Sequence, residues 1–323
     1  MIKRVAVLTS GGDSSGMNPC IRSVVRNAIF NGLSVMGIYD GFKGLIADQI
    51  FEMNEASVSG IINRGGTILY TSRCEEFKTI EGRTQALSNL RKHGIDALII
   101  IGGDGSYKGG NALNKEFGFP VIGIPGTIDN DIQGTDYTIG YDTAVNVAME
   151  AIDKIRDTAT SHGRLFLVEV MGRHAGYIAL EVGIASGAEE ILIPETITNF
   201  DEMLENLEKG RKRGKRSSII VVAEGEETGG AYTIAERIKG KTGYRMRVVI
   251  LGHMQRGGAP TAYERLMASR FGYYAVKALL DEKHGTAIGI KNGTVSYTDL
   301  EEATTKPLQI NTSDFELARA LSI

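Results

Sequence analysis

The chain has 323 residues, a length that predicts two domains, and its composition, 42% hydrophobic and 23% charged, is typical of a globular protein. Its net charge of −3 argues against a general nucleic-acid-binding protein, so an anionic ligand would need local clusters of arginine or lysine. The two cysteines, Cys20 and Cys74, cannot form a disulfide framework; with no apolar stretch of membrane-spanning length, they predict reduced thiols in a cytoplasmic protein.

Short apolar runs that end at glycine or a small polar residue recur along the chain and predict strands. In chain order the runs are residues 5–8, 35–39, 97–101, 121–124, 165–170, 191–193, 219–222 and 248–251. Continuous apolar runs are typical of parallel strands that helices cover on both faces. Helical spacing of apolar residues predicts helices over residues 18–31, 142–156, 201–213 and 262–280. The alternation predicts an α/β fold with ligands at the carboxyl ends of the strands, and domain crossings near residues 134–140 and 248–251.

The loop Ser10-Gly11-Gly12-Asp13-Ser14-Ser15-Gly16 joins the first strand to a helix. Its glycines let the backbone approach a phosphate, and free N–H groups at the helix N-terminus favour an anion. A plain tight turn fits the same residues equally well. The later segment Gly102-Gly103-Asp104-Gly105-Ser106 presents one isolated carboxylate at a strand end. Such a carboxylate suits Mg²⁺ bound together with substrate phosphates, although a helix-capping aspartate is also compatible.

The run Pro125-Gly126-Thr127-Ile128-Asp129-Asn130-Asp131 follows the next apolar strand. Asp129 and Asp131 are two residues apart in a rigid turn, so one carboxylate is suited to accept a hydroxyl proton while the other adjusts the charge near a metal ion. An Asx-rich surface turn is the alternative. The position of the run, in register with the preceding glycine–aspartate segment, favours the catalytic interpretation.

Four arginines lie close to predicted strands: Arg164, Arg173, Arg247 and Arg256. A guanidinium binds phosphate through two hydrogen bonds, so arginines repeated at strand ends predict a phosphorylated substrate, although a surface salt bridge is the alternative for any one of them. His253 lies among glycines beside Gln255, which favours a hydrogen bond to the same substrate. A second basic set comprises Arg22 and Arg26, one helical turn apart, and residues 211–216, for which a solvated helix end is a strong alternative.

In combination, the segments 102–106, 125–131, 171–173 and 252–258 resemble those of bacterial-type ATP-dependent 6-phosphofructokinases, and the likeness runs over nearly the full chain. The resemblance implies two doubly wound α/β/α (Rossmann-like) domains with the active site in the cleft between them. A larger ATP-binding domain is expected over residues 1–139 plus 253–304, and a smaller fructose 6-phosphate-binding domain over 140–252 plus 305–323. The implied reaction transfers the γ-phosphoryl group of MgATP to the 1-hydroxyl of fructose 6-phosphate, which yields fructose 1,6-bisphosphate and ADP in glycolysis.

Carried over residue by residue, the resemblance implies that Asp129 is the general base, assisted by Thr127, and that Arg73 and Arg173 also take part in catalysis. The residues expected to bind ATP, with Asp104 toward Mg²⁺, are Gly12, Arg73, Cys74, Gly103, Asp104, Gly105 and Ser106. Those expected to bind the sugar phosphate are Thr127, Ile128, Asp129, Arg164, Met171, Gly172, Arg173, Glu224, Arg247, His253, Met254, Gln255 and Arg256. In the family Arg164 and Arg247 reach in from a neighbouring subunit, which implies a homotetramer.

The resemblance also implies an effector site for ADP or phosphoenolpyruvate. Its expected residues are Arg22, Arg26, Arg156, Gly187, Ala188, Glu189, Arg213, Lys215, Arg216 and Ser217. The sequence departs from the family pattern at three places, which are expected to affect the stiffness of the first glycine-rich loop and the regulation of the enzyme by effectors. Ser14-Ser15 replaces a usual Ala-Pro, Glu55 stands where some members have arginine, and Ser217 stands where many have histidine.

Two glycines predict the phosphoryl donor. Pyrophosphate-using relatives tend to have aspartate at position 105 and lysine at position 126, where bulk would obstruct the inner phosphate and ribose of a nucleotide. Gly105 and Gly126 leave this space open and favour ATP. The alternatives are a pyrophosphate-dependent enzyme, a non-catalytic phosphometabolite sensor, and an NAD or lipid kinase, which would lack the Pro125–Asp131 run. No nucleic acid or membrane partner is expected.

Overall fold

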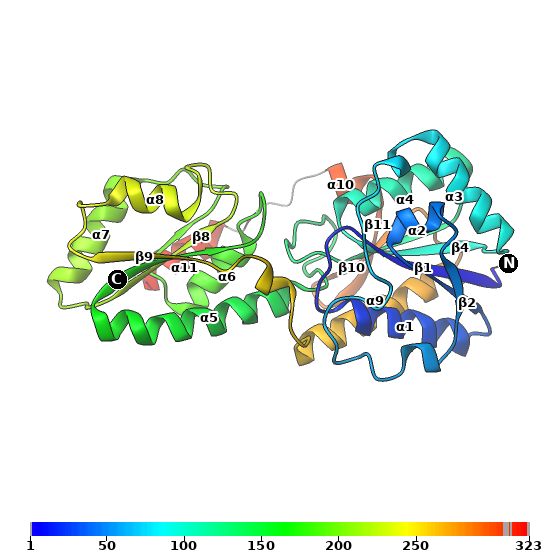
Figure 1. Cartoon of the computed structure of the whole chain (residues 1–323), viewed down its shortest axis with the longest axis horizontal. Helices are drawn as coiled ribbons and strands as arrows, with labels where there is room; N and C mark the ends of the chain where they lie inside the picture. The colour runs from blue at the N-terminus through cyan, green and yellow to red at the C-terminus, as the bar shows by residue number, and fades with distance from the viewer. Residues whose placement is uncertain (1, 306–309, 311, 322–323) are drawn as a thin grey trace. The chain divides into compact units, whose positions relative to one another are not determined.

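The computed structural model describes residues 2–305, 310 and 312–321 (Figure 1). The chain divides into two compact units. The first unit is Met1–Thr143 with Arg256–Leu308, and the second unit is Ala144–Gln255 with Gln309–Ile323. Helix α5 (Tyr141–His162) and the short 3-10 helix η3 (Gly252–Arg256) carry the chain from one unit to the other. Among the described residues, no helix combines the length and the apolar character needed to cross a membrane.

The first unit is built on a seven-stranded sheet in the order β11-β10-β5-β4-β1-β2-β3. The strands are β1 (Arg4–Ser10), β2 (Ser34–Ile38), β3 (Ile50–Met53), β4 (Ala97–Gly102), β5 (Val121–Pro125), β10 (Thr286–Lys291) and β11 (Thr294–Asp299). The inner strands are parallel, whereas the edge strands β3 and β11 are antiparallel to their neighbours. The strand order reverses between β1 and β4. In open parallel sheets such a reversal opens a crevice for ligands at the carboxyl ends of the strands.

Helices cover both faces of this sheet (Figure 1). The helices on one face are α2 (Gly41–Ile46), α3 (Ile80–Lys92) and α4 (Asp104–Phe117), and those on the other are α1 (Met17–Phe30) and α9 (Ala262–Leu280). Leu8, Leu98 and Ile100 of the sheet belong to the apolar cluster under the first group. Because both faces are covered, every residue of β4 is buried. The short helices η1 (Ala56–Val58), η2 (Glu76–Lys78) and α10 (Glu302–Thr305) complete the unit.

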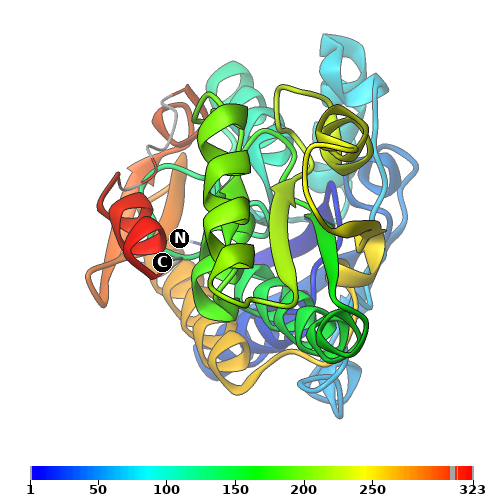
Figure 2. The same ribbon diagram turned by 90° about the vertical axis from the view of Figure 1, so that its left-hand side faces the viewer.

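The second unit contains a parallel four-stranded sheet in the order β7-β8-β6-β9. The strands are β6 (Arg164–Val170), β7 (Glu190–Leu192), β8 (Ser218–Ala223) and β9 (Arg245–Ile250). Helices α7 (Phe200–Lys212) and α8 (Gly230–Ile238) pack on one face against Leu165, Leu167 and Ile220, and α5 and α6 (Tyr177–Ser186) lie on the other (Figure 1). Figure 2 turns this unit toward the viewer and shows α11 (Thr312–Leu321, red) at its edge, where α11 contacts α6 and β7.

Strand β9 differs from its prediction. The apolar run 248–251 predicts a buried strand, but β9 begins at Arg245 and is partly exposed, with 50% of Ile250 accessible. The reason is that its first half alternates charged and apolar residues, and that β9 pairs with β6 alone among the described strands. The other predicted strands and all four predicted helices are present, with shifted ends except for the helix over residues 262–280, whereas β3, β10 and β11 have no counterpart among the predicted runs.

Candidate functional site

Three loops that carry candidate residues follow neighbouring strands of the first unit. These strands are β1, β4 and β5, which are adjacent in the sheet. The amide N–H of Gly126 donates to the carbonyl oxygen of Gly102 (3.0 Å), and the hydroxyl of Ser106 donates to the carbonyl oxygen of Ser10 (3.0 Å). The predicted donor-side loops therefore meet at one edge of the sheet, where the strand order reverses.

The loop after β1 is anchored through its carbonyl groups. The hydroxyl of Thr71 donates to the carbonyl oxygen of Gly11 (2.8 Å), and Nη1 of Arg256 donates to that of Asp13 (3.0 Å). Gly11 has a φ of 90°, a conformation in which a residue with a side chain would be strained. The guanidinium of Arg256 lies against Gly12, since a Cβ on Gly12 would be 2.6 Å from Nη1. Arg256, which the resemblance assigns to the sugar phosphate, thus contacts the predicted nucleotide loop.

Asp104 is the first residue of α4, and its side chain is 44% exposed with Nζ of Lys108 2.8 Å from Oδ2. Mg²⁺ usually binds one or two carboxylates together with substrate phosphates and keeps several waters. Across residues 2–305, 310 and 312–321, no group of three or more His, Cys, Asp or Glu side chains is placed to hold a metal ion. Asp104 offers one accessible carboxylate, of the kind that binds Mg²⁺ together with the phosphates of a nucleotide.

Asp129 lies in a rigid loop after β5. Its side chain is only 3% exposed, and its amide N–H donates to the hydroxyl of Thr127 (3.2 Å). The hydroxyl of Thr138 bonds the carbonyl oxygen of Thr127 (2.6 Å) and Oδ1 of Asn130 (3.1 Å). Ile128 is fully buried and fixes the loop to the core. These contacts fix the backbone of the loop that carries Asp129, and a general base needs such a fixed position.

Arg73 and Cys74 lie in a segment that is tied to two strand ends. The hydroxyl of Ser72 donates to the carbonyl oxygen of Asp40 after β2 (2.8 Å), and Thr71 bonds the loop after β1 as described above. Cys74 is a free, half-buried thiol packed against the apolar core of the first unit, which assigns it a packing role. The side chain of Arg73 is exposed and therefore accessible to an anion.

In the second unit, predicted sugar-phosphate residues follow the carboxyl ends of β6, β8 and β9. The amide N–H of Met171 donates to Oε1 of Gln255 (2.8 Å), and that of Arg173 donates to Oε2 of Glu224 (3.2 Å). Arg173 has a φ of 52° and Gly172 a φ of 144°, so the backbone is strained at this point, as is common at functional sites. The exposed side chains of this set are those of Arg173, Glu224, His253 and Met254.

Arg164 and Arg247 lie apart from this group. Arg164 begins β6, a strand of seven residues. At about 3.3 Å per residue it lies roughly 20 Å from the residues that follow the strand. Arg247 lies inside β9, in register with Phe166, and Arg245 is in register with Arg164. Because side chains alternate along a strand, Arg164 and Arg247 share one face of the sheet, far from Arg173.

Most of the predicted effector residues lie in the second unit. Nη2 of Arg156 donates to the carbonyl oxygen of Gly187 (3.2 Å), and Nζ of Lys215 lies 2.7 Å from Oε1 of Glu189. One lysine of the set is therefore neutralised by a carboxylate of the same set. The further members in this unit are Ala188, Arg213, Arg216 and Ser217, and the members in the first unit are Arg22 and Arg26 on α1.

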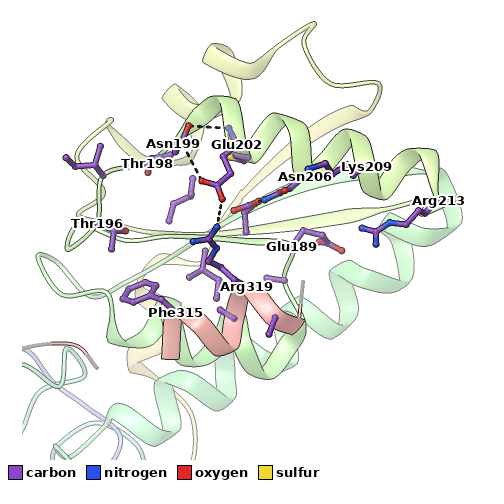
Figure 3. A pocket seen from close by; sticks show the side chains of 18 of the residues that line it. Glu189, Thr196, Thr198, Asn199, Glu202, Asn206, Lys209, Arg213, Phe315 and Arg319 are labelled. Carbon is purple, nitrogen blue, oxygen red and sulfur yellow. Dashed lines mark hydrogen bonds and ion pairs between the residues drawn. The ribbon is translucent and has the colours of Figure 1, made fainter. Parts of the chain in front are cut away.

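A cavity of about 920 Å³ in the second unit borders this set (Figure 3). It lies between α7, β7 and α11, and Ala188, Glu189 and Arg213 form part of its wall. An ion pair between Nη2 of Arg319 and Oε1 of Glu202 (2.6 Å) links α11 to α7 across it. Among the described residues, its lining includes none of the predicted catalytic side chains.

Sequence reasoning missed residues that hold the loops in place without being expected to touch a ligand. Thr71, Thr138 and Ser15 all donate hydroxyl hydrogen bonds to carbonyl oxygens in or beside these loops. Their partners are distant in the sequence, so no motif spacing points to them. A serine or threonine beside a glycine-rich loop was the one available signal, and it is too common to be specific.

Comparisons of the sequence and of the structure with known proteins all find phosphofructokinases. A family model described as Phosphofructokinase matches residues 4–279. The ATP-dependent 6-phosphofructokinases of Bacillus licheniformis and Bacillus subtilis are 53% and 52% identical over 322 residues, which is 100% of this chain and 100% of each relative. The solved phosphofructokinase from Saccharomyces cerevisiae has a TM-score of 0.90 and 36% identity over 99% of this chain, which spans only 48% of the yeast chain.

A solved pyrophosphate-dependent phosphofructokinase from Marinobacter aquaeolei has a TM-score of 0.85 and covers 100% of this chain and 92% of that chain. At 23% identity it is informative about the fold alone. Together with the two sheets described above, these likenesses confirm the predicted α/β fold class.

Proposed function

The chain belongs to the phosphofructokinase family, and we propose on this basis that it uses ATP to phosphorylate fructose 6-phosphate. The reaction transfers the γ-phosphoryl group to the 1-hydroxyl and yields fructose 1,6-bisphosphate and ADP, a step of glycolysis. Full-length relatives named for this activity support the proposal. The structural observation that carries it is the convergence of the loops after β1, β4 and β5 beside the buried Asp129.

Phosphoryl transfer depends on positioning and charge stabilisation more than on covalent chemistry. We assign the glycine-rich loops at Gly12 and Gly103 to the phosphates of ATP, because glycine lets backbone N–H groups approach a phosphate closely. Asp129 accepts the proton of the 1-hydroxyl as its oxygen attacks, and Thr127 holds the backbone of Asp129 in place. The guanidinium groups of Arg73 and Arg173 stabilise the charge on the transferred group.

A divalent cation belongs to the same proposal. Mg²⁺ bound with ATP beside Asp104 would neutralise charge on the phosphates. The exposed carboxylate of Asp104 supports this assignment. Lys108 pairs with this carboxylate, so Mg²⁺ would either displace the lysine or bind the carboxylate together with it. Activity that survives full removal of divalent cations by a chelator would refute the assignment.

The proposed reaction is tested by incubating the purified chain with fructose 6-phosphate and MgATP and following fructose 1,6-bisphosphate. Formation of the bisphosphate, dependent on both substrates, is the expected result. A protein that binds either substrate but forms no bisphosphate would instead be a phosphometabolite sensor.

A sugar-phosphate site completed by a second copy of the chain is part of the proposal. Arg164 and Arg247 share a sheet face and lie roughly 20 Å and roughly 13 Å along it from the loop of Arg173, a spacing that favours their acting at the site of another copy. The exposed edge strand β9 supports contact with another copy. We propose a homotetramer, as in the family, and light scattering tests it: a fully active monomer would contradict the proposal.

We place the enzyme in the cytoplasm. Its cysteines support this, since Cys20 is a buried free thiol and Cys74 a half-buried one, as is usual in a reducing compartment. Cell fractionation that recovers the activity outside the soluble cytoplasmic fraction would contradict it.

We also propose that ADP or phosphoenolpyruvate binds as an effector at the Arg213 end of the cavity in Figure 3. Anionic ligands need several donors, and Arg213, the residue that follows α7, is close in sequence to Lys215 and Arg216. Glu189 neutralises Lys215, so Arg213 is expected to contribute more of the attraction for an anion.

Replacing Arg213 by serine is expected to weaken the binding of phosphoenolpyruvate about 10-fold or more, since a hydrogen bond to a charged group contributes about 1.5–3 kcal/mol. Phosphoenolpyruvate is the better probe because ADP is also a product of the reaction. Isothermal titration calorimetry measures the effect. Arg211→Ser is the matched control and should leave the affinity unchanged. Arg211 lies about half a helical turn before Arg213, and its guanidinium pairs with Glu208 (3.0 Å). Unchanged affinity in Arg213→Ser, or a wild-type chain that binds neither effector, would refute this site.

A further inference from the structure

Ser15, in the loop after β1, is held by the segment that follows η3. Its side chain is 1% exposed, and its hydroxyl lies 3.0 Å from the carbonyl oxygen of Gly258 and 3.3 Å from that of Arg256. A buried hydroxyl that loses its acceptor is costly. This contact therefore fixes the distance between two segments that are more than two hundred residues apart in the chain.

Arg256 makes the return contact. Its Nη1 donates to the carbonyl oxygen of Asp13 (3.0 Å), and its guanidinium covers Gly12 so closely that a Cβ there would lie 2.6 Å from Nη1. Residues 13–15 and 256–258 are thus tied in both directions. We call the contacts among Asp13, Ser15, Arg256 and Gly258 the loop clamp.

We propose that the loop clamp positions the β1 loop for the phosphates of ATP, so that Ser15 and Arg256 are positioning residues for the phosphoryl donor. The proposal rests on the ATP-dependent transfer proposed above. Backbone N–H groups bind a phosphate well only when their directions are fixed, and glycines have no side chains with which to fix them. The clamp supplies this restraint at Asp13 and at Ser15, directly after Gly12.

The clamp also gives Arg256 two functions. The resemblance assigns its guanidinium to the sugar phosphate, whereas the structure shows that guanidinium bonded to the predicted nucleotide loop. A positive charge over Gly12 favours an anion at this loop as well. Changes at Arg256 should therefore affect both substrates, and changes at Ser15 should affect the nucleotide alone.

The test compares Ser15→Ala with Ser23→Ala. Ser23 is a buried serine of α1 whose hydroxyl donates to the carbonyl oxygen of Ser269 (2.6 Å), so its replacement removes the same kind of hydrogen bond outside the clamp. In Ser15→Ala we expect the Kd of MgATP, measured by calorimetry without sugar phosphate, and the KM for ATP to rise about 3- to 10-fold, on the scale of one lost hydrogen bond. The KM for fructose 6-phosphate and kcat should stay within about 2-fold in both variants.

Normal MgATP affinity in a folded Ser15→Ala protein, or an equal loss in Ser23→Ala, would overturn the loop clamp. If Ser15→Ala does not fold, Arg256→Lys keeps the charge but loses the planar fork, and it should weaken both MgATP and fructose 6-phosphate. Normal MgATP binding in Arg256→Lys would then overturn the clamp. A wild-type chain that does not bind MgATP would refute the proposed function itself, which is a separate outcome.

Discussion

A variant in which Asp129 is replaced by serine is expected to bind fructose 6-phosphate nearly normally and to lose about 10²–10⁴-fold in kcat. A serine hydroxyl does not accept a proton near neutral pH, so the attacking 1-hydroxyl loses its base. The loop itself should persist, because the backbone amide of residue 129, which serine keeps, donates to the hydroxyl of Thr127. Steady-state kinetics with both substrates varied separate the effect on kcat from the effect on KM.

Asp136→Ser is the matched control for this variant. Asp136 belongs to the same connection between β5 and α5, but its carboxylate accepts a hydrogen bond from the amide of Asn292 (2.6 Å) and lies at an exposed position. Its replacement should change kcat by no more than about 2-fold, as is usual for surface positions. Near-normal turnover in Asp129→Ser would remove Asp129 from the role of base.

Replacing Gly105 by aspartate is expected to lower kcat/KM for ATP by about 10²–10³-fold, because like charges brought together cost several kcal/mol. The new carboxylate would stand in the first turn of α4, at the loop assigned to the phosphates. The fold should be unaffected, since a Cβ at this position meets no described atom within 4 Å, and an acidic residue is favourable at a helix N-terminus. Kinetics and thermal unfolding, measured on the same preparation, check both statements.

Gly105→Asn separates charge from size, because asparagine has the shape of aspartate without its charge. We expect Gly105→Asn to lose much less activity than Gly105→Asp, and Gly105→Ala to lose least. Equal losses in the first two variants would mean that bulk obstructs the nucleotide. Wild-type use of ATP by Gly105→Asp would invalidate the argument that glycine at this position favours ATP.

The fold was predictable where apolar runs are buried on both faces. Residues 97–101 lie in β4, every residue of which is buried, and the predicted helix 262–280 has the observed bounds of α9. The edge strands were harder because they are half exposed and contain polar residues. In β11 (Thr294–Asp299) polar and apolar residues alternate, so the strand shows no continuous apolar run.

The candidate site was predictable only in part. The motif residues after β1, β4 and β5 meet because the carboxyl ends of parallel strands share one edge of the sheet. Closeness to a strand in the sequence does not tell how far a residue lies from the ligand-binding end, so the positions of Arg164 in β6 and Arg247 in β9 needed the structure. The sequence shows that Ser14-Ser15 departs from the family pattern, but it does not show what these serines bind. The hydroxyl of Ser14 donates to the carbonyl oxygen of Ile139 (2.9 Å), and that of Ser15 donates to the carbonyl oxygen of Gly258. Only the folded chain brings such pairs together.

A comparison of phosphoryl donors shows whether ATP donates the phosphoryl group to fructose 6-phosphate. The purified wild-type chain is assayed for fructose 1,6-bisphosphate with fructose 6-phosphate and either MgATP or magnesium pyrophosphate at equal concentrations. We expect rapid formation of the bisphosphate with ATP and none above background with pyrophosphate. Activity with pyrophosphate but not with ATP would contradict it.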